Sequence, residues 1–153
     1  MRYIKKFNEN NSWVSIISEE ISDILLEVTD LGYYCHIETS QWTNNRNNSV
    51  RICIYGKEET IWDNGYRLKI GFLYPDEVLE TIERLVSYLE SIGYYLGDSN
   101  KKELETIRNI KSLEKNKKEI VIKLSLYSQI ILVWDDKINN YKIQNTISLS
   151  FRK

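Results

Sequence analysis

The chain has no alanine and contains one proline, one histidine and two cysteines among its 153 residues. A single histidine excludes metal sites built from several histidines and any catalytic arrangement that needs a second one. The two cysteines cannot form a disulfide scaffold. Strand alternation points Cys35 and Cys53 to opposite faces of a predicted sheet, where disulfide geometry is out of reach, so we expect free thiols in a reducing cytoplasm.

Other features are missing as well. No apolar run approaches the roughly 18 residues that a membrane span needs, and the opening MRYIKKFNE lacks the apolar core of a signal peptide. There is no phosphate-binding loop, no dinucleotide-binding glycine motif and no C-x-x-C pair. Lysine plus arginine (21) nearly equals aspartate plus glutamate (22), so no global field attracts nucleic acid. We therefore expect no cofactor, no metal site and no catalytic residue.

Two segments have the periodicity of amphipathic helices that bury one face. The first starts at Ser15 or Ser18 and ends at Gly32, and the second starts at Pro75 and ends at Gly93. Each glycine is followed by two tyrosines. A helix that stops in a left-handed glycine takes an apolar residue after it, so the repeated G-Y-Y indicates two similar helix ends. Their apolar positions are Ile17, Ile21, Ile24, Leu25, Val28 and Leu31 in the first, and Val78, Leu79, Ile82, Leu85, Val86, Leu89 and Ile92 in the second.

Three strand-like runs lie between these helices, at residues 33–39, 49–55 and 66–73. Polar connections separate them, and Asn64-Gly65 is a turn signal. The segment 98–118 is charged and is either a third helix or a connector. After it, residues 119–153 alternate apolar and polar positions, as a β-meander does. The acidic segment 74–98 and the basic segment 101–123 either pair, within the molecule or between copies, or are simply solvated surfaces.

These elements predict a single α+β domain over residues 1–153. It consists of an N-terminal arm (1–14), an α-β-β-β-α unit (15–97) with two helices packed on an antiparallel sheet, the charged segment (98–118) and a C-terminal β-meander (119–153). The meander either extends the first sheet or covers its other face.

Two groups of side chains are candidates for binding. Trp13, Trp42 and Trp62 lie in or beside predicted loops, where a large aromatic residue either folds back onto the core or anchors an interface. If both helices cover one face of the sheet, the other face presents aromatic and basic side chains that suit single-stranded nucleic acid. The candidates on that face are Tyr34, Arg51, Tyr55, Arg67 and Lys69, with His36, Glu38 and Cys53 beside them.

The order helix, three strands, helix over residues 15–95 resembles the double-stranded-RNA-binding domain. That family grips phosphates with lysines at the start of its second helix. Here those positions hold Pro75, Asp76, Glu77 and Glu80, which argues against duplex RNA binding. The opening MRYIKKFNE looks like the start of small proteins of tailed bacteriophages. In some phages such peptides, ending in a pattern like Phe7-Asn8-Glu9, address proteins to the prohead and are trimmed there.

Three functions remain open. The first is a non-enzymatic protein-interaction or structural protein, encoded by a phage and located in the host cytoplasm or the virion, with a protein partner or self-association. The second is a single-stranded nucleic-acid-binding protein that uses the open sheet face. The third is a small enzyme with a divalent cation on carboxylates such as Asp63 or the pair Asp135-Asp136, because hard cations prefer oxygen ligands.

Overall fold

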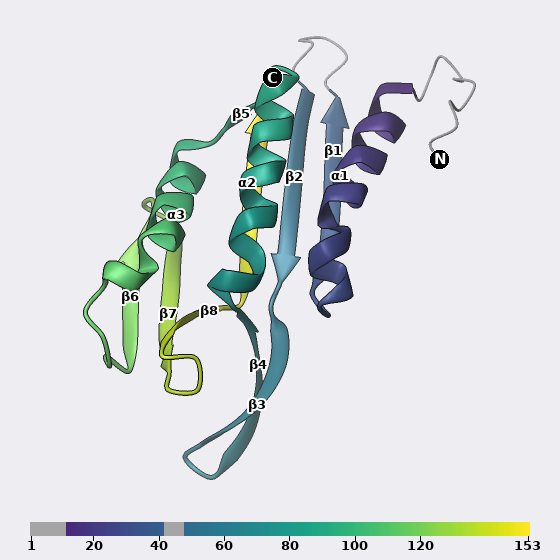
Figure 1. The fold of residues 1–153 in the computed structure, drawn as a ribbon. Helices are drawn as coiled ribbons and strands as arrows, with labels where there is room; N and C mark the ends of the chain where they lie inside the picture. The colour runs from purple at the N-terminus through teal and green to yellow at the C-terminus, as the bar shows by residue number, and fades with distance from the viewer. Residues whose placement is uncertain (1–11, 42–47) are drawn as a thin grey trace.

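The computed structural model describes residues 12–41 and 48–153, and within this part the fold is α+β with three α-helices and nine strands in two antiparallel sheets (Figure 1). The N-terminal half contains α1 (Ser12–Asp30), β1 (Tyr34–Gln41), β2 (Asn48–Tyr55), β3 (Lys57–Asp63), β4 (Tyr66–Leu73) and α2 (Pro75–Ser91). The C-terminal half contains β5 (Tyr95–Leu96), α3 (Asp98–Arg108), a short 3-10 turn (Ile110–Ser112), β6 (Glu119–Lys123), β7 (Gln129–Asp135), β8 (Asn140–Gln144) and β9 (Thr146–Arg152).

Both long helices end as the repeated G-Y-Y predicts. Gly32 and Gly93 have left-handed backbones, with φ of 100° and 93°. The amide of Tyr33 donates to the carbonyl of Val28, and the amide of Tyr94 donates to that of Leu89. These are the bonds of a Schellman stop, and both tyrosines are buried in the core. The G-Y-Y repeat is therefore confirmed as a helix-ending device.

The four-stranded sheet has the order β1-β2-β9-β5, and α1 and α2 lie side by side on one of its faces (Figure 1). Val50, Ile52 and Ile54 of β2 are fully or almost fully buried beneath the helices, next to Ile147 and Leu149 of β9. The predicted inward face is therefore confirmed, and Cys35 and Cys53 point to opposite faces as free thiols.

The three predicted strands do not form one sheet. Residues 66–73 do not pair with 49–55, because β9 pairs with β2 along seven residues. The polar stretch after Gly56, expected to be a loop, is β3, and β4 pairs with β3 in the second sheet. The unit before α2 therefore has four strands in two sheets. Alternation shows which side of a strand is buried, but it does not identify the neighbouring strand.

The second sheet has the order β3-β4-β8-β7-β6. The alternating run near the C-terminus is divided at Asn145, where φ is 75°, so that β8 belongs to this sheet and β9 to the first. The meander thus extends the first sheet and also builds a second one. The charged segment contains α3, whose Leu104 and Ile107 join the core. Arg108 pairs with Glu83 of α2, so acidic and basic segments meet within the molecule.

Candidate functional site

The hairpin of β3 and β4 extends away from the rest of the protein, and we call residues 57–71 the arm (Figure 1). Within the described part of the chain, the only other strand that pairs with β4 is β8, and only at Phe72 and Leu73. The tip turns at Asn64 and Gly65, both with positive φ, as the Asn-Gly signal predicts. The part of the arm beyond its root is thus held by its own two strands.

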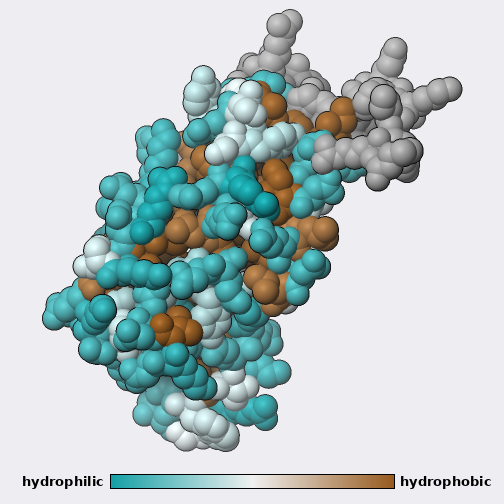
Figure 2. Space-filling model, viewed as in Figure 1, coloured by the Kyte–Doolittle hydropathy of each residue, from teal (hydrophilic) through white to brown (hydrophobic). Residues whose placement is uncertain are grey.

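Large aromatic side chains lie exposed near the tip of the arm. Trp62 and Tyr66 are each 73% exposed. In the space-filling view the arm is hydrophilic to intermediate, and hydrophobic residues that reach the surface gather above it, over the helices (Figure 2). The register places Trp62 opposite Arg67 and Thr60 opposite Lys69. Three of the predicted interaction residues, Trp62, Arg67 and Lys69, therefore come together on one face of the arm.

At its root the arm meets the rest of the fold through close backbone contacts. The amide of Gly56 donates to the carbonyl of Asn145 at 2.8 Å, and the amide of Asn145 donates to the carbonyl of Gly71 at 2.8 Å. A Cβ on Gly56 would lie 2.4 Å from the amide nitrogen of Phe72. Only glycine fits there, so the two glycines allow the strand that leaves the first sheet to enter the second.

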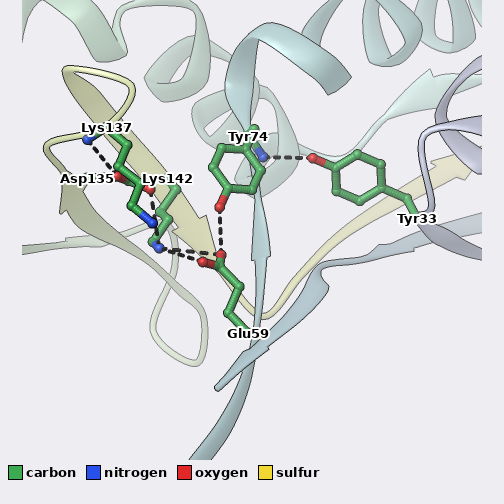
Figure 3. Close-up of polar contacts among 6 residues, drawn as sticks. All are labelled: Tyr33, Glu59, Tyr74, Asp135, Lys137 and Lys142. Carbon is green, nitrogen blue, oxygen red and sulfur yellow. Dashed lines mark hydrogen bonds and ion pairs between the residues drawn. The ribbon is translucent and has the colours of Figure 1, made fainter. Parts of the chain in front are cut away.

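A polar network fastens the arm to β8 and the start of α2 (Figure 3). The hydroxyl of Tyr74 donates to Glu59 of the arm at 2.7 Å. The ammonium of Lys142 lies 3.2 Å from the same carboxylate and 3.4 Å from Asp135. The side chains of Lys142 and Asp135 are only 11% and 12% exposed. Lys142 also lies over the ring of Phe72, 4.1 Å from its centroid. The network therefore fixes the direction in which the arm points.

A second set of contacts continues this network towards α1. The hydroxyl of Tyr33 donates to Glu77 at 2.6 Å and accepts from the amide of Tyr74 at 3.0 Å. Burial and the hydrogen bond to Glu77 raise the pKa of Tyr33, so its hydroxyl remains a donor. Burial opposes the ionisation of Glu77, but bonds from Tyr33 and Lys57 outweigh it and lower the pKa of Glu77. The side chains of Tyr33, Lys57 and Glu77 therefore hold one another in place through hydrogen bonds.

A groove of about 560 Å³ runs beside these contacts, along Lys57, Glu59, Tyr74 and Asn140. Among the residues that the structure places there, its lining holds no histidine or cysteine. The three carboxylates that line it already have partners: Glu59 contacts Lys142 and Tyr74. Glu77 contacts Lys57 and Tyr33, and Asp76 pairs with Lys111. The described residues include no group of three or more histidine, cysteine or acidic side chains placed to hold a metal ion. The carboxylates suggested for a cation are apart: Asp63 ends β3 near the tip of the arm, whereas Asp135 lies in the network at its root.

The other predicted residues lie on the open face, which is the face of the four-stranded sheet opposite α1 and α2. It carries Tyr34, His36, Glu38, Arg51, Cys53, Tyr55, Ser148 and Ser150. The rings of Tyr34 and Tyr55 are 5.5 Å apart. His36 pairs with Glu38 at 3.3 Å, and Arg51 donates to the hydroxyl of Ser148 at 3.1 Å. Arg67 and Lys69 were also expected on this face, but they belong to the arm in the other sheet.

The other three tryptophans are Trp13, Trp42 and Trp134, and no described contact places any of them in the arm. Trp13 lies in the first turn of α1, not in a loop, and its side chain is outside the described part of the chain. Trp42 lies wholly outside the described residues. Trp134, which sequence reasoning did not select, packs edge-on against Tyr141 at 5.0 Å and donates to Asp136 at 2.7 Å. It supports the core.

Sequence reasoning missed Glu103 of α3. Its side chain is buried, and its Oε1 atom has no hydrogen-bond partner. Desolvation raises the pKa of this carboxyl to about 7, with Asn100 opposing the shift through a hydrogen bond. It lines a cleft of about 640 Å³ beside the open face, together with Arg51 and Arg152. The available signal was its position four residues before Ile107, on the apolar side of the helix.

No helix among the described residues is long and apolar enough to cross a membrane. Comparison of the chain with protein-family models, with curated proteins and with solved structures finds no match.

Proposed function

We propose that this is a non-enzymatic interaction protein that contacts a protein partner through the arm. The observation that carries the proposal is the 73% exposure of Trp62 and Tyr66 near the tip of a hairpin whose root is fixed. Tryptophan and tyrosine are the residues that most often anchor protein interfaces. A fixed root also reduces the conformational freedom that the arm would lose on binding.

The charge of the arm supports a protein partner over nucleic acid. Its three basic residues, Lys57, Arg67 and Lys69, are matched by three acidic ones, Glu58, Glu59 and Asp63. A phosphate backbone needs a net positive surface, whereas a protein interface needs an aromatic centre with a mixed polar rim. A structural or assembly role in a phage, in the host cytoplasm or the virion, is the setting that the N-terminal resemblance suggests.

The proposal is tested by purifying the tagged protein from cells that make it naturally and identifying bound proteins by mass spectrometry. Trp62→Ala should lose the partner. Tyr127→Ala is the control, because Tyr127 is an aromatic residue in the connection after β6 that is even more open to solvent, at 94% against 73% for Trp62. Loss of the partner from both variants, or from neither, would show that the arm is not the contact.

Single-stranded nucleic acid on the open face is a second candidate. The observation that favours it is the Tyr34–Tyr55 pair beside Arg51, whose guanidinium contacts a serine hydroxyl and no described carboxylate. Bases stack on aromatic rings, and arginine holds phosphates. Fluorescence anisotropy with labelled oligonucleotides at low salt tests it. Arg51→Glu should abolish binding and Arg67→Glu, on the arm, should not; a wild-type protein that binds no oligonucleotide removes this candidate.

A further inference from the structure

The strand β6 forms one edge of the five-stranded sheet. Among the described residues it pairs only with β7, from Glu119 opposite Val133 to Lys123 opposite Gln129. An edge strand presents a row of unpaired amides and carbonyls, which is a template for another strand. Its side chains are exposed at Glu119, Val121 and Lys123 and half-buried at the two isoleucines between them.

Backbone hydrogen bonds at the two ends of β6 show which groups face outwards. The carbonyl of Lys118 accepts from the amide of Trp134, and the amide of Leu124 donates to the carbonyl of Ser128. Since alternate residues of an antiparallel strand point to the same neighbour, Ile120 and Ile122 also point towards β7. The amides and carbonyls of Glu119, Val121 and Lys123 therefore face the free edge.

The sequence of β6 is symmetrical in charge and shape. Read in either direction, Glu-Ile-Val-Ile-Lys has a charged residue at each end, isoleucine next to it and valine at the centre. If two copies pair antiparallel about Val121, Glu119 of each copy lies opposite Lys123 of the other, which gives two ion pairs. The isoleucines lie opposite each other in the same way. Neither Glu119 nor Lys123 has an ion-pair partner within the described residues, so both remain available.

We propose that two copies of this chain associate through β6, which pairs antiparallel with its counterpart about Val121 and joins the two five-stranded sheets into one sheet of ten strands. The three outward residues form mutual pairs, which supplies about six backbone hydrogen bonds. Two Glu–Lys pairs flank a Val–Val contact on the exposed face. A symmetric pair uses the same patch on both copies, and this patch is its own complement.

The opposite edge of the same sheet fits a second copy less well. Pairing β3 with itself about Thr60 would bring Lys57 opposite Asp63, but it would also set Glu58 against Trp62 and Glu59 against Ile61. Opposite charges and apolar pairs stabilise neighbouring strands, whereas a carboxylate opposite an apolar side chain adds nothing. Two five-residue edges bury less than the roughly 1,200 Å² of a stable interface, so we expect a weak dimer.

The test uses sedimentation velocity across a range of protein concentrations. Glu119→Lys and Lys123→Glu should each weaken the dimer by about tenfold or more, because each replaces two attractive pairs with two repulsive ones. The double variant should dimerise like the wild type. Lys102→Glu, an exposed substitution on α3 that changes the net charge by the same amount as Lys123→Glu, is the control for that variant and should leave the dimer unchanged.

A mixing experiment tests whether β6 pairs in the proposed register, with residue 119 of one copy opposite residue 123 of the other. Glu119→Lys and Lys123→Glu are each expected to be monomeric, yet a mixture of the two should form a heterodimer in which every lysine faces a glutamate. Circular dichroism of each variant checks that the fold is intact. A wild type that stays monomeric at every concentration, or a dimer that the single variants leave unchanged, would overturn the proposal.

This proposal does not depend on the proposed partner of the arm. Trp62→Ala should leave the dimer intact, and the charge variants of β6 should retain any protein that the arm binds. Loss of the dimer in Trp62→Ala with no effect of the β6 variants would also overturn the proposal, because it would place self-association on the arm.

Discussion

The hydroxyl of Tyr33 donates a hydrogen bond of 2.6 Å to the carboxylate of Glu77, and this bond joins the end of α1 to the start of α2. Tyr33 belongs to the stop that ends the first helix, and Glu77 lies in the first turn of the second. A residue that the local sequence uses to end one helix therefore also helps to place the other.

Tyr33→Phe should lower the free energy of unfolding by about 2 kcal/mol, because it removes a bond to a charged group and leaves the amide of Tyr74 without its acceptor. Urea denaturation measures the change. Tyr34→Phe is the matched control, since Tyr34 is exposed, and it should stay within about 0.5 kcal/mol of the wild type. Equal stability of the two variants would contradict the prediction.

The same bond gives a dependence on pH. The pKa of Glu77 in the folded chain is below its ordinary value of 4.5. Its ionised form therefore stabilises the fold above pH 4.5, and this contribution is lost as the pH falls through the lower folded value. Because Tyr33 is one cause of the lowered pKa, Tyr33→Phe should lose less stability than the wild type on acidification below pH 4.5. Urea titrations of both proteins at several acidic pH values would show the difference.

Lys142→Met should destabilise the protein by about 3 kcal/mol, because it leaves the carboxylates of Glu59 and Asp135 facing each other without a cation. Thermal and urea unfolding measure the loss. Lys137→Met, an exposed change of the same kind, should have little effect. Adding Glu59→Gln to Lys142→Met should recover part of the loss, and a Lys142→Met variant as stable as the wild type would show that the network does not hold the arm.

Gly56→Ala should cost about 3 kcal/mol or prevent folding, because the new Cβ would lie 2.4 Å from the amide nitrogen of Phe72. Gly65→Ala is the comparison, because it introduces backbone strain at a position where the new Cβ is not crowded. Gly65 has a φ of 81° with nothing within 4 Å of its Cβ position, so its substitution should cost only about 1 kcal/mol. Denaturant unfolding of the two variants compares these costs, and a reversed order would contradict the close contact at the root of the arm.

Glu103 should make the protein less stable as the pH rises towards neutrality. Its pKa is about 7 in the folded chain against an ordinary value of 4.5, so the folded state binds this proton more tightly than the unfolded state does. The free energy of unfolding should therefore fall between pH 4.5 and pH 7 and level off above, by up to about 3 kcal/mol.

Glu103→Gln should remove that slope and be more stable than the wild type at pH 8, with little difference at pH 4.5. The measurement is urea denaturation across this pH range. Glu105→Gln, an exposed change on the same helix, should keep the wild-type profile. A wild type whose stability does not fall over the range would show that Glu103 ionises freely.

The ends of both long helices, the buried face of β2 and the turn at Asn64-Gly65 were predictable. Each depends on backbone preferences or on periodicity within a few neighbouring residues. The open face was predicted correctly for Tyr34, Arg51 and Tyr55, because alternation along β1 and β2 is local. It was wrong for Arg67 and Lys69, because their place depends on the strand that pairs with β4.

The candidate sites could be predicted only in part. Trp62 was selected as a loop tryptophan. Its position near the tip of the arm depends on the close backbone contact between Gly56 and Gly71, where the chain leaves the first sheet and enters the second. The network of Glu59, Lys142 and Asp135 left no signal, since nothing local shows that a lysine in β8 is buried between two carboxylates. For Glu103 the sequence contained only a weak signal, which was its position on the apolar side of α3.

The amino-acid sequence alone determined where the helices stop and which side of each strand is apolar, because those properties depend on the conformations and side chains of adjacent residues. Tertiary structure decided that β2 lies next to β9, that β3 and β4 form a separate arm, and that β6 is left at an edge. An antiparallel strand offers the same backbone bonds to many partners. The choice among them comes from how the whole chain packs its core.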